Sequence, residues 1–268
     1  MTSIYETLRD RIRSSEPVGL VTVVDGPNIG AKLLIRPDHA ALGTLGDDEL
    51  DRIVGRDALA ELEAATTGVR HYGPHGETTP EDLIDTDTVA VFVESFAPPP
   101  QMWIFGAVDF TAALAKVAKM LGYRVTVCDA REVFATTRRF PMADEVLVSW
   151  PGRLFTERGN SLGPRDAVCV LTHDSKFDVP AVMGAIGTSV GYIGVMGSRK
   201  THDKRMDRLA EAGLTEPDQI ERLMSPIGLD IGARTPEETA ISICAEIISR
   251  RTGRRSPSLR DGAGAIHS

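Results

Sequence analysis

The stretch WIFGAVDFTAALA, residues 103–115, places an apolar strand, a glycine turn and an alanine-rich helix in direct succession. A dinucleotide-binding fold begins with a strand, a turn and a helix in this order. Gly106 occupies the first position of the glycine fingerprint, but Val108 and Thr111 occupy the second and third. Because a Cβ at the second position crowds an approaching pyrophosphate, we do not expect NAD(P) to bind.

Asp129 ends the next predicted strand, about 20 residues further on, where such folds place an acid that binds a ribose hydroxyl. An aspartate after a strand is also ordinary turn chemistry. Both roles for Asp129 stay open at this point.

Apolar segments of strand length alternate with helix-like segments throughout residues 101–252. The strand-like ones are QMWIFG, YRVTVCDA, DEVLVSW, DAVCVLTHD and VGYIGVMG, and the helix-like ones are DFTAALAKVAKMLG, VPAVMGAIG and THDKRMDRLAEAG. Such alternation predicts an α/β domain, a parallel sheet with helices on both faces.

The segment APPP, residues 97–100, predicts a domain boundary, because prolines neither continue a strand ladder nor start a helix at once. Before it, residues 1–100 contain four strand-like segments and one helix-like stretch, which predicts a small α+β domain. After it, residues 101–252 form the α/β domain. Its last helix starts at a predicted capping box of Thr235 and Glu238, and residues 253–268 form a polar tail predicted to be disordered.

Composition narrows the function classes. The formal charge is 30 minus 38, or −8, which argues against nucleic-acid binding as the main activity. The apolar runs are too short to span a membrane, so we expect a cytoplasmic protein. Cys128, Cys169 and Cys244 lie far apart inside apolar segments, which predicts buried thiols and no metal site. No serine or cysteine stands in an elbow motif, so no catalytic residue is predicted.

The segment THDSKFDVP, residues 172–180, follows the strand VCVL. His173, Asp174 and Asp178 should therefore emerge at the carboxyl edge of the sheet, where open α/β sheets bind ligands. An alternative is that Asp178 caps the next helix while His173 packs in the loop. The pattern does not decide between the two.

The segment GYIGVMGSRK, residues 191–200, indicates a strand, a turn and a helix start. Gly197 permits a tight turn, Ser198 or Thr201 can cap the helix, and Arg199 and Lys200 add two cations beside free amides. This combination favours an anion-binding site over a solvated helix start, because cations at a helix N-terminus oppose the helix macrodipole unless an anion is bound.

A second glycine loop, SPIGLDIGARTPEE, runs from residue 225 to 238 and sets Gly228 and Gly232 around Asp230 before the last helix. It is a candidate second wall of the same site. A plain surface connector is the alternative.

These segments together resemble the XdhC/CoxI family, the accessory factors of xanthine dehydrogenase, carbon monoxide dehydrogenase and related molybdenum hydroxylases. The strongest are RVTVCDAREVFATTRRFPMADEV, GYIGVMGSRKTHDKRMDRLAEAGL and PIGLDIGARTPEETAISICAEII, and the resemblance spans most of the chain. It implies an N-terminal XdhC/CoxI domain followed by a Rossmann-like domain.

The resemblance also implies a function. Such a protein would hold molybdopterin, the molybdenum cofactor, transiently, support its sulfuration by a cysteine desulfurase, and deliver it to the large subunit of a hydroxylase. It also implies a homodimer. Molybdopterin carries a phosphate, which supplies a ligand for the predicted anion-binding turn.

The sequence departs from the family pattern in the N-terminal domain. Glu49 stands in the position of the family cysteine, Asp47 and Asp48 replace two glycines, and Asp109 replaces a histidine in the later glycine turn. A thiolate can carry sulfur, whereas a carboxylate cannot. We therefore expect a cofactor-binding chaperone, and we keep as alternatives an NAD(P)-dependent oxidoreductase and a degenerate member that acts only as a scaffold.

Overall fold

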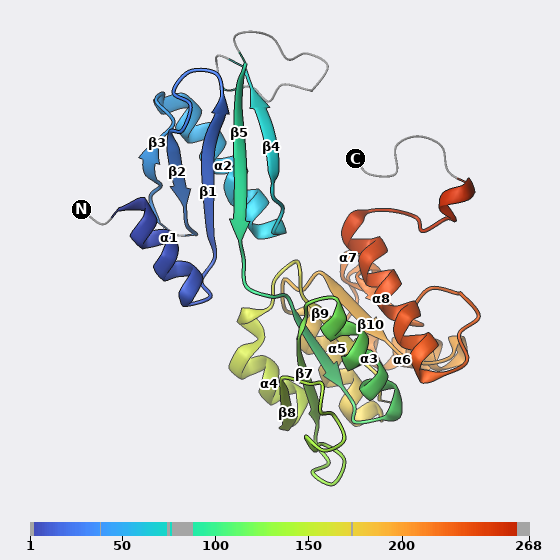
Figure 1. The fold of residues 1–268 in the computed structure, drawn as a ribbon. Helices are drawn as coiled ribbons and strands as arrows, with labels where there is room; N and C mark the ends of the chain where they lie inside the picture. The colour runs from blue at the N-terminus through green and yellow to red at the C-terminus, as the bar shows by residue number, and fades with distance from the viewer. Residues whose placement is uncertain (1–2, 38, 74–75, 77–87, 173, 262–268) are drawn as a thin grey trace. The chain divides into compact units, whose positions relative to one another are not determined.

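The computed structural model describes residues 3–37, 39–73, 76, 88–172 and 174–261. The chain divides into two compact units, Met1–Pro98 and Pro99–Ser268 (Figure 1). The division falls inside the proline-rich segment 97–100.

The first unit is an antiparallel sheet with a helix on each face (Figure 1). Its strand order is β3-β2-β1-β5-β4, with bounds Val18–Asp25 for β1, Lys32–Ile35 for β2, Leu42–Thr44 for β3, Gly68–Tyr72 for β4 and Val89–Phe96 for β5. The short strand β3 was not expected from the sequence. The predicted small α+β architecture is confirmed.

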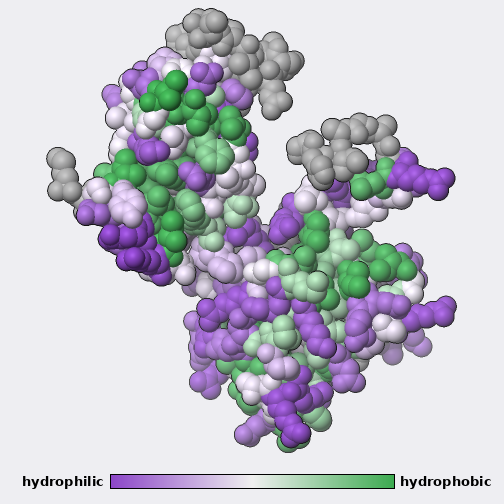
Figure 2. All heavy atoms as spheres, viewed as in Figure 1, coloured by the Kyte–Doolittle hydropathy of each residue, from purple (hydrophilic) through white to green (hydrophobic). Residues whose placement is uncertain are grey.

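The two helices bury opposite faces of this sheet. Helix α2 (Asp48–Ala64) is capped by Asp47, and its apolar residues, spaced by about one turn, pack on one face. Helix α1 (Ile4–Arg13) begins at a capping box of Ser3 and Glu6 and packs through Ile4 and Leu8 on the other. It covers that face only in part, and Figure 2 shows apolar residues exposed beside it.

The second unit contains a sheet whose strand pairs are all parallel. Its order is β11-β10-β9-β6-β7-β8, with bounds Gln101–Phe105 for β6, Arg124–Asp129 for β7, Glu145–Val148 for β8, Ala167–Val170 for β9, Tyr192–Val195 for β10 and Leu223–Met224 for β11. Numbered along the chain, these strands read 3-2-1-4-5-6 from β8 to β11, the doubly wound order of dinucleotide-binding folds. The predicted Rossmann-like α/β domain is confirmed.

Alternate residues of β6 face the two helical layers. Met102 and Ile104 join a cluster with helices α3 (Asp109–Met120) and α8 (Pro236–Thr252), whereas Trp103 and Phe105 join a cluster on the other face. That second cluster includes α4 (Pro151–Arg158), α5 (Ser175–Ile186) and α6 (Arg199–Glu211), and the short helix α7 (Pro217–Glu221) precedes β11. None of the helices in the described residues is long and apolar enough to cross a membrane.

The last helix begins as its sequence predicts. Thr235 and Glu238 form a capping box at the start of α8, and Gly253, in a left-handed conformation, follows its end. Beyond it lies a short 3₁₀ turn, Leu259–Asp261, while residues 262–268 fall outside the described part of the chain.

The second unit should fold without the first. Its two buried clusters draw all their members from residues 102–247, and the clusters of the first unit draw theirs from residues 4–96. We expect a fragment of residues 101–252 to unfold in one cooperative thermal transition. A fragment that stays soluble but melts without a cooperative transition would contradict this boundary.

Candidate functional site

Four loops of the second unit are joined to one edge of the sheet by backbone hydrogen bonds. The amide of Gly106 donates to Cys128 O (2.9 Å), Leu171 to Phe105 O (2.8 Å), Met196 to Val170 O (2.8 Å) and Ile227 to Val195 O (3.1 Å). Each bond links a residue just past one strand to the end of its neighbour. The carboxyl ends of β6, β7, β9 and β10 therefore form a common edge.

Most of the predicted site residues lie at this edge. Gly106 follows β6, Asp129 ends β7 and Asp174 follows β9. The residues Gly197–Lys200 form the turn after β10, and Gly228 belongs to the loop beside that turn. Asp230 and Gly232 lie further along that loop in exposed positions, and a Cβ at Gly232 would meet nothing within 4 Å. His173 lies outside the described residues.

Both carboxylate oxygens of Asp129 accept hydrogen bonds from groups within the chain. The residue is buried (2% exposed), and its Oδ2 accepts from the amide of Ala107 (2.7 Å), while Oδ1 accepts from the amide of Arg131 (2.9 Å). The Arg131 guanidinium adds a bidentate contact at 2.9 and 2.8 Å. Burial alone would raise the pKa of Asp129, but these hydrogen bonds outweigh it and lower the pKa. Asp129 thus holds the turn after β6 in place. Because both its oxygens already accept hydrogen bonds, neither is free to bind a ribose hydroxyl.

The loops after β6 and β9 lie in close contact at the point where the strand order reverses. Gly106 has a φ of +109°, and a Cβ there would lie 2.9 Å from the amide nitrogen of Thr172. Gly106 is therefore required for contact between two loops of the chain. The carbonyl of Ala107 next to it accepts from Arg139 Nη1 (3.1 Å).

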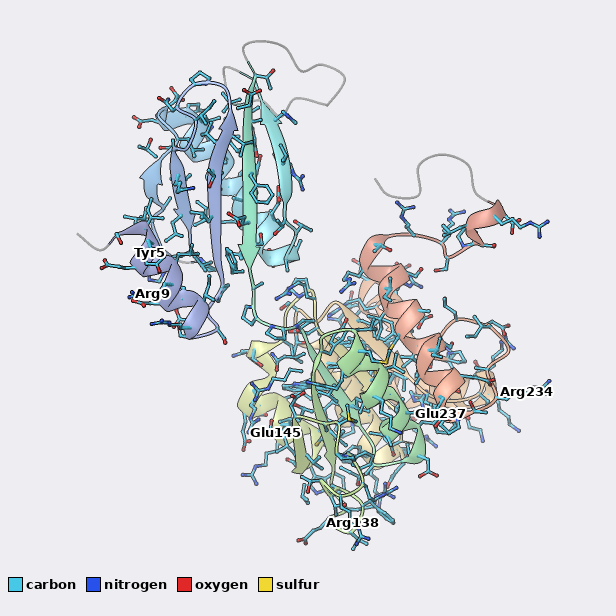
Figure 3. The ribbon with its side chains drawn as sticks, in the orientation of Figure 1. Tyr5, Arg9, Arg138, Glu145, Arg234 and Glu237 are labelled. Carbon is cyan, nitrogen blue, oxygen red and sulfur yellow. The ribbon has the colours of Figure 1, made fainter. Side chains whose placement is uncertain are left out.

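The start of α3 carries a negative charge where a dinucleotide fold would hold a pyrophosphate. Asp109 lies in the first turn with its side chain 91% exposed, 3.6 Å from Arg139 Nη2. The loop that supplies Arg139 also supplies Arg131, whose guanidinium lies 4.7 Å from the ring centre of Phe134. Figure 3 shows Arg138 of this loop projecting away from the sheet.

Asp174 and Asp178 have different roles. Asp174 caps α5 by accepting from the amide of Lys176 at 3.0 Å. The alternative in which Asp178 is the cap is wrong, because Asp178 lies inside the first turn, buried, with Oδ2 at 3.2 Å from Arg205 Nη2. Asp174, the residue directly before the helix, is the N-cap.

The turn after β10 presents charge to solvent. Ser198 caps α6 by accepting from the amide of Thr201 (3.2 Å), as the sequence indicated. Arg199 and Lys200 occupy the first turn, both exposed, and no acidic residue shares that turn. Among the described residues, no hydrogen-bond partner is seen for the backbone amides of Arg199 and Lys200. Unpaired amides and two cations therefore lie together at this helix start.

The second glycine loop is anchored beside this turn. Gly194 in β10 leaves room for Ile227, since a Cβ at Gly194 would lie 2.4 Å from Ile227 Cδ1. The amide of Gly228 donates to Glu246 Oε2 (2.9 Å) on α8, and the same oxygen accepts from Tyr192 at 2.5 Å. Residues 225–228 thus lie against the end of β10.

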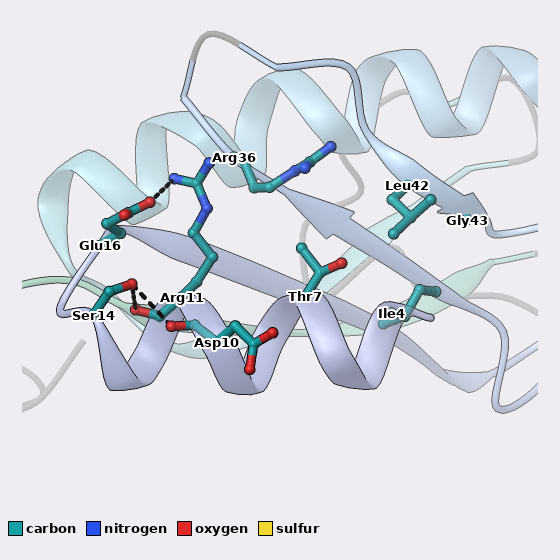
Figure 4. A pocket seen from close by; sticks show the side chains of 9 residues that line it. All are labelled: Ile4, Thr7, Asp10, Arg11, Ser14, Glu16, Arg36, Leu42 and Gly43. Carbon is teal, nitrogen blue, oxygen red and sulfur yellow. Dashed lines mark hydrogen bonds and ion pairs between the residues drawn. The ribbon is translucent and has the colours of Figure 1, made fainter. Parts of the chain in front are cut away.

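A groove of about 790 Å³ lies in the first unit beside α1 (Figure 4). Its lining residues are Ile4, Thr7, Asp10, Arg11, Ser14, Glu16, Arg36, Leu42 and Gly43. Arg11 and Glu16 form an ion pair at 2.7 Å, and the two acids balance the two arginines. The groove has no excess positive charge, so the carboxyl edge is the better candidate for an anionic ligand.

No thiol is available in either unit. Cys128, Cys169 and Cys244 are all buried, and burial raises the pKa of Cys128 and of Cys244 to about 12. Glu49 lies in the first turn of α2, where Arg52 donates to both its oxygens. In the described residues no group of three metal-ligating side chains gathers.

The comparisons with known proteins agree with this architecture. Residues 102–247 match the model of the XdhC Rossmann domain, and residues 11–73 match that of the XdhC and CoxI family. The chain belongs to the XdhC and CoxI family. The family resemblance inferred from the sequence is thereby confirmed.

Two individual relatives illustrate the relationship. A protein of Bacillus subtilis (strain 168), named as a probable xanthine dehydrogenase subunit, is 34% identical over 92% of this chain and 64% of its own length. The molybdenum cofactor insertion chaperone PaoD of Escherichia coli (strain K12) is 32% identical over 32% of this chain and 26% of its own. The chain thus spans less than two thirds of either relative.

A solved structure supports the fold alone. This chain is similar to the crystal structure of a xanthine dehydrogenase from Bacillus halodurans, with 21% sequence identity and a TM-score of 0.51. The match covers 94% of this chain and 97% of that chain.

Sequence reasoning missed the residues that hold this XdhC-type edge together. Arg131 and Arg205 look like solvated charges in polar segments. One signal was present for Arg205, because it precedes the buried Leu209 by four residues on α6 and so shares its inward stripe. The signal for Arg131 was its place two residues after Asp129, where the side chain of an aspartate in a turn binds the backbone amide.

We expect NAD and NADP to bind weakly or not at all. Asp129 is occupied by Ala107 and Arg131, and Val108 and Asp109 stand where a pyrophosphate would approach. Isothermal titration calorimetry of the full chain with each dinucleotide measures this. A dissociation constant near 1 μM, about −8 kcal/mol, would contradict an obstructed site and would favour an oxidoreductase.

Proposed function

We propose that this protein is an accessory factor that binds the molybdenum cofactor and delivers it to a molybdenum hydroxylase of the xanthine or carbon monoxide dehydrogenase type. The observation that carries the proposal is the turn Gly197–Lys200, an exposed cationic helix start at the carboxyl edge of a doubly wound sheet. The name of the similar Escherichia coli protein, molybdenum cofactor insertion chaperone, supports it.

The turn suits the phosphate of molybdopterin. The helix macrodipole and the free first-turn amides attract an anion. Arg199 offers a planar fork for two phosphate oxygens, and Lys200 offers a point charge. Because both cations are exposed, a bound cofactor could also be released to a partner, as delivery requires. The protein would therefore bind the cofactor only transiently in this proposal.

The sulfur chemistry belongs to a partner in this proposal. Glu49 is paired with Arg52, and the three thiols are buried, two of them with pKa values of about 12, so this chain has no group suited to carrying sulfur. A cysteine desulfurase would sulfurate the cofactor while the chain holds it. The hydroxylase large subunit would then receive it, with a homodimer in the cytoplasm as the working form.

The two alternatives fit the site less well. An NAD(P)-dependent oxidoreductase needs a free acid after β7 and an open pyrophosphate turn, whereas Asp129 is occupied and Asp109 stands in that turn. A scaffold without cofactor would not need two cations at a helix start, where they oppose the macrodipole.

Arg199→Ala should weaken molybdopterin binding by roughly tenfold to a hundredfold, because a charge-assisted hydrogen bond contributes about 1.5–3 kcal/mol. Lys200→Ala should act in the same direction but less. Added salt should weaken binding to the wild type. Equilibrium binding at low and high salt measures all three effects.

Arg208→Ala is the matched control, since it removes the same charge from the exposed last turn of the same helix. Its affinity should equal that of the wild type. If the double variant Arg199→Ala, Lys200→Ala binds molybdopterin as tightly as Arg208→Ala at low salt, with matched melting temperatures, the turn is not the site.

The native thiols should resist alkylation. With a pKa of about 12, only about one part in 10⁴ of Cys128 or Cys244 is thiolate at pH 8, and both are shielded. Iodoacetamide followed by mass spectrometry should find three unmodified cysteines in the native protein and three alkylated ones after denaturation. Rapid alkylation of one native thiol would restore a sulfur-carrying role to this chain.

A further inference from the structure

Arg205 is a buried cation at the centre of the carboxyl edge. The residue is 2% exposed, although it belongs to the polar helix α6. Its guanidinium contacts three separate segments of the chain. Nη2 donates to Met196 O (2.8 Å) and lies 3.2 Å from Asp178 Oδ2, and Nη1 donates to Ser225 Oγ (3.3 Å).

These contacts join the two glycine loops. Met196 begins the turn that ends in the exposed cations, and Ser225 begins the loop that carries Gly228, Asp230 and Gly232. The two contact residues are 29 positions apart in the sequence (225 − 196), and both bind the same side chain. One guanidinium therefore spans both walls of the candidate site.

The geometry points to Arg205 as a positioning residue that couples the anion-binding turn to the second glycine loop. The consequence for cofactor binding rests on the proposed function. Anion binding at Arg199 and Lys200 fixes the turn, the turn fixes Met196 O, and Arg205 carries that restraint to Ser225. The loop 225–234 is then held in place when the turn is occupied.

Burial excludes Arg205 as a direct ligand. The backbone of Gly197 lies over it, since a Cβ at Gly197 would be 3.5 Å from Arg205 Nη1 and 3.2 Å from Thr201 Cβ. A ligand outside the turn meets the amides and the exposed cations first. The Arg205 charge is instead balanced by the buried Asp178.

The chain provides a matched control in Arg222. This partly buried arginine also binds several chain oxygens, donating to the carbonyls of Ile186, Thr188 and Val190 at 2.8–3.1 Å. Those carbonyls precede β10, at the opposite edge of the sheet. Arg222→Lys thus removes a similar clamp at the other end of β10 and makes no direct change in the turn 196–201.

The test compares amide hydrogen exchange in the ligand-free full-length wild type, Arg205→Lys and Arg222→Lys. Arg205→Lys keeps the charge near Asp178 but has a single nitrogen, so it cannot reach all three segments. We expect exchange to accelerate by about tenfold at the hydrogen-bonded amides of both loops, Met196 and Thr201 in the turn and Ile227 and Gly228 in the second loop. Arg222→Lys should leave the amides of Met196 and Thr201 at wild-type rates.

Ser225→Ala keeps the proposal testable if Arg205→Lys does not fold. It removes one contact in the second loop only, and coupling predicts faster exchange in residues 196–201 as well. Acceleration confined to residues near 225, or equal acceleration of both segments in Arg222→Lys, would overturn the coupling.

Molybdopterin binding gives the second readout. Arg205→Lys should lose about tenfold in affinity while the salt dependence of binding stays as in the wild type, because Arg199 and Lys200 remain. A variant with wild-type affinity and accelerated exchange would show that the coupling does not serve binding. If the wild type itself does not bind molybdopterin, the proposed function fails, whereas the exchange experiment still decides the coupling.

Discussion

The parallel sheet of the second unit constrains everything else in this protein. Because all six strands run the same way, every connection that follows a strand must start at the same edge. Glycine turns, helix starts and their charges are therefore gathered there, while the opposite edge receives only returning loops. The doubly wound order also sets the distance between the turns, since β10 and β7 are three strands apart, about 14 Å at the usual spacing.

Within that edge, the chain uses its charges in two different ways. Around β6 and β7, Arg131 pairs with Asp129, and Asp129 and Arg139 both bind the backbone of Ala107. The turn that holds the pyrophosphate in dinucleotide-binding folds is therefore closed here by the chain's own side chains. Around β10, Arg205 and Asp178 are buried beneath the turn, and Arg199 and Lys200 above it are left to solvent. The turn after β6 is thus closed by hydrogen bonds within the chain, whereas the turn after β10 exposes its cations to solvent.

Local patterns were enough to predict the elements and most of the edge. The segment 103–115 predicted β6 and α3, and the capping box of Thr235 and Glu238 predicted where α8 begins, because both depend on neighbours within one or two turns. Strand β3 has three residues, none of them buried, and α4 buries only Pro151 and Leu154, so neither shows a clear apolar pattern. The contacts of Arg205, and the bond from the amide of Ala107 to Asp129, depend on partners brought close by the strand order, which no local spacing reveals. Asp178 paired with an arginine 27 residues away, where local chemistry suggested a cap.

In the function that we propose, this fold holds a pterin and not a nicotinamide dinucleotide. The most direct measurement is the identity of the small molecule that the full-length protein releases on denaturation, by mass spectrometry, after purification at low salt from cells that make the molybdenum cofactor. We predict a phosphate-bearing pterin. Release of NAD or NADP in stoichiometric amount, or no pterin even after incubation with excess molybdopterin, would contradict it.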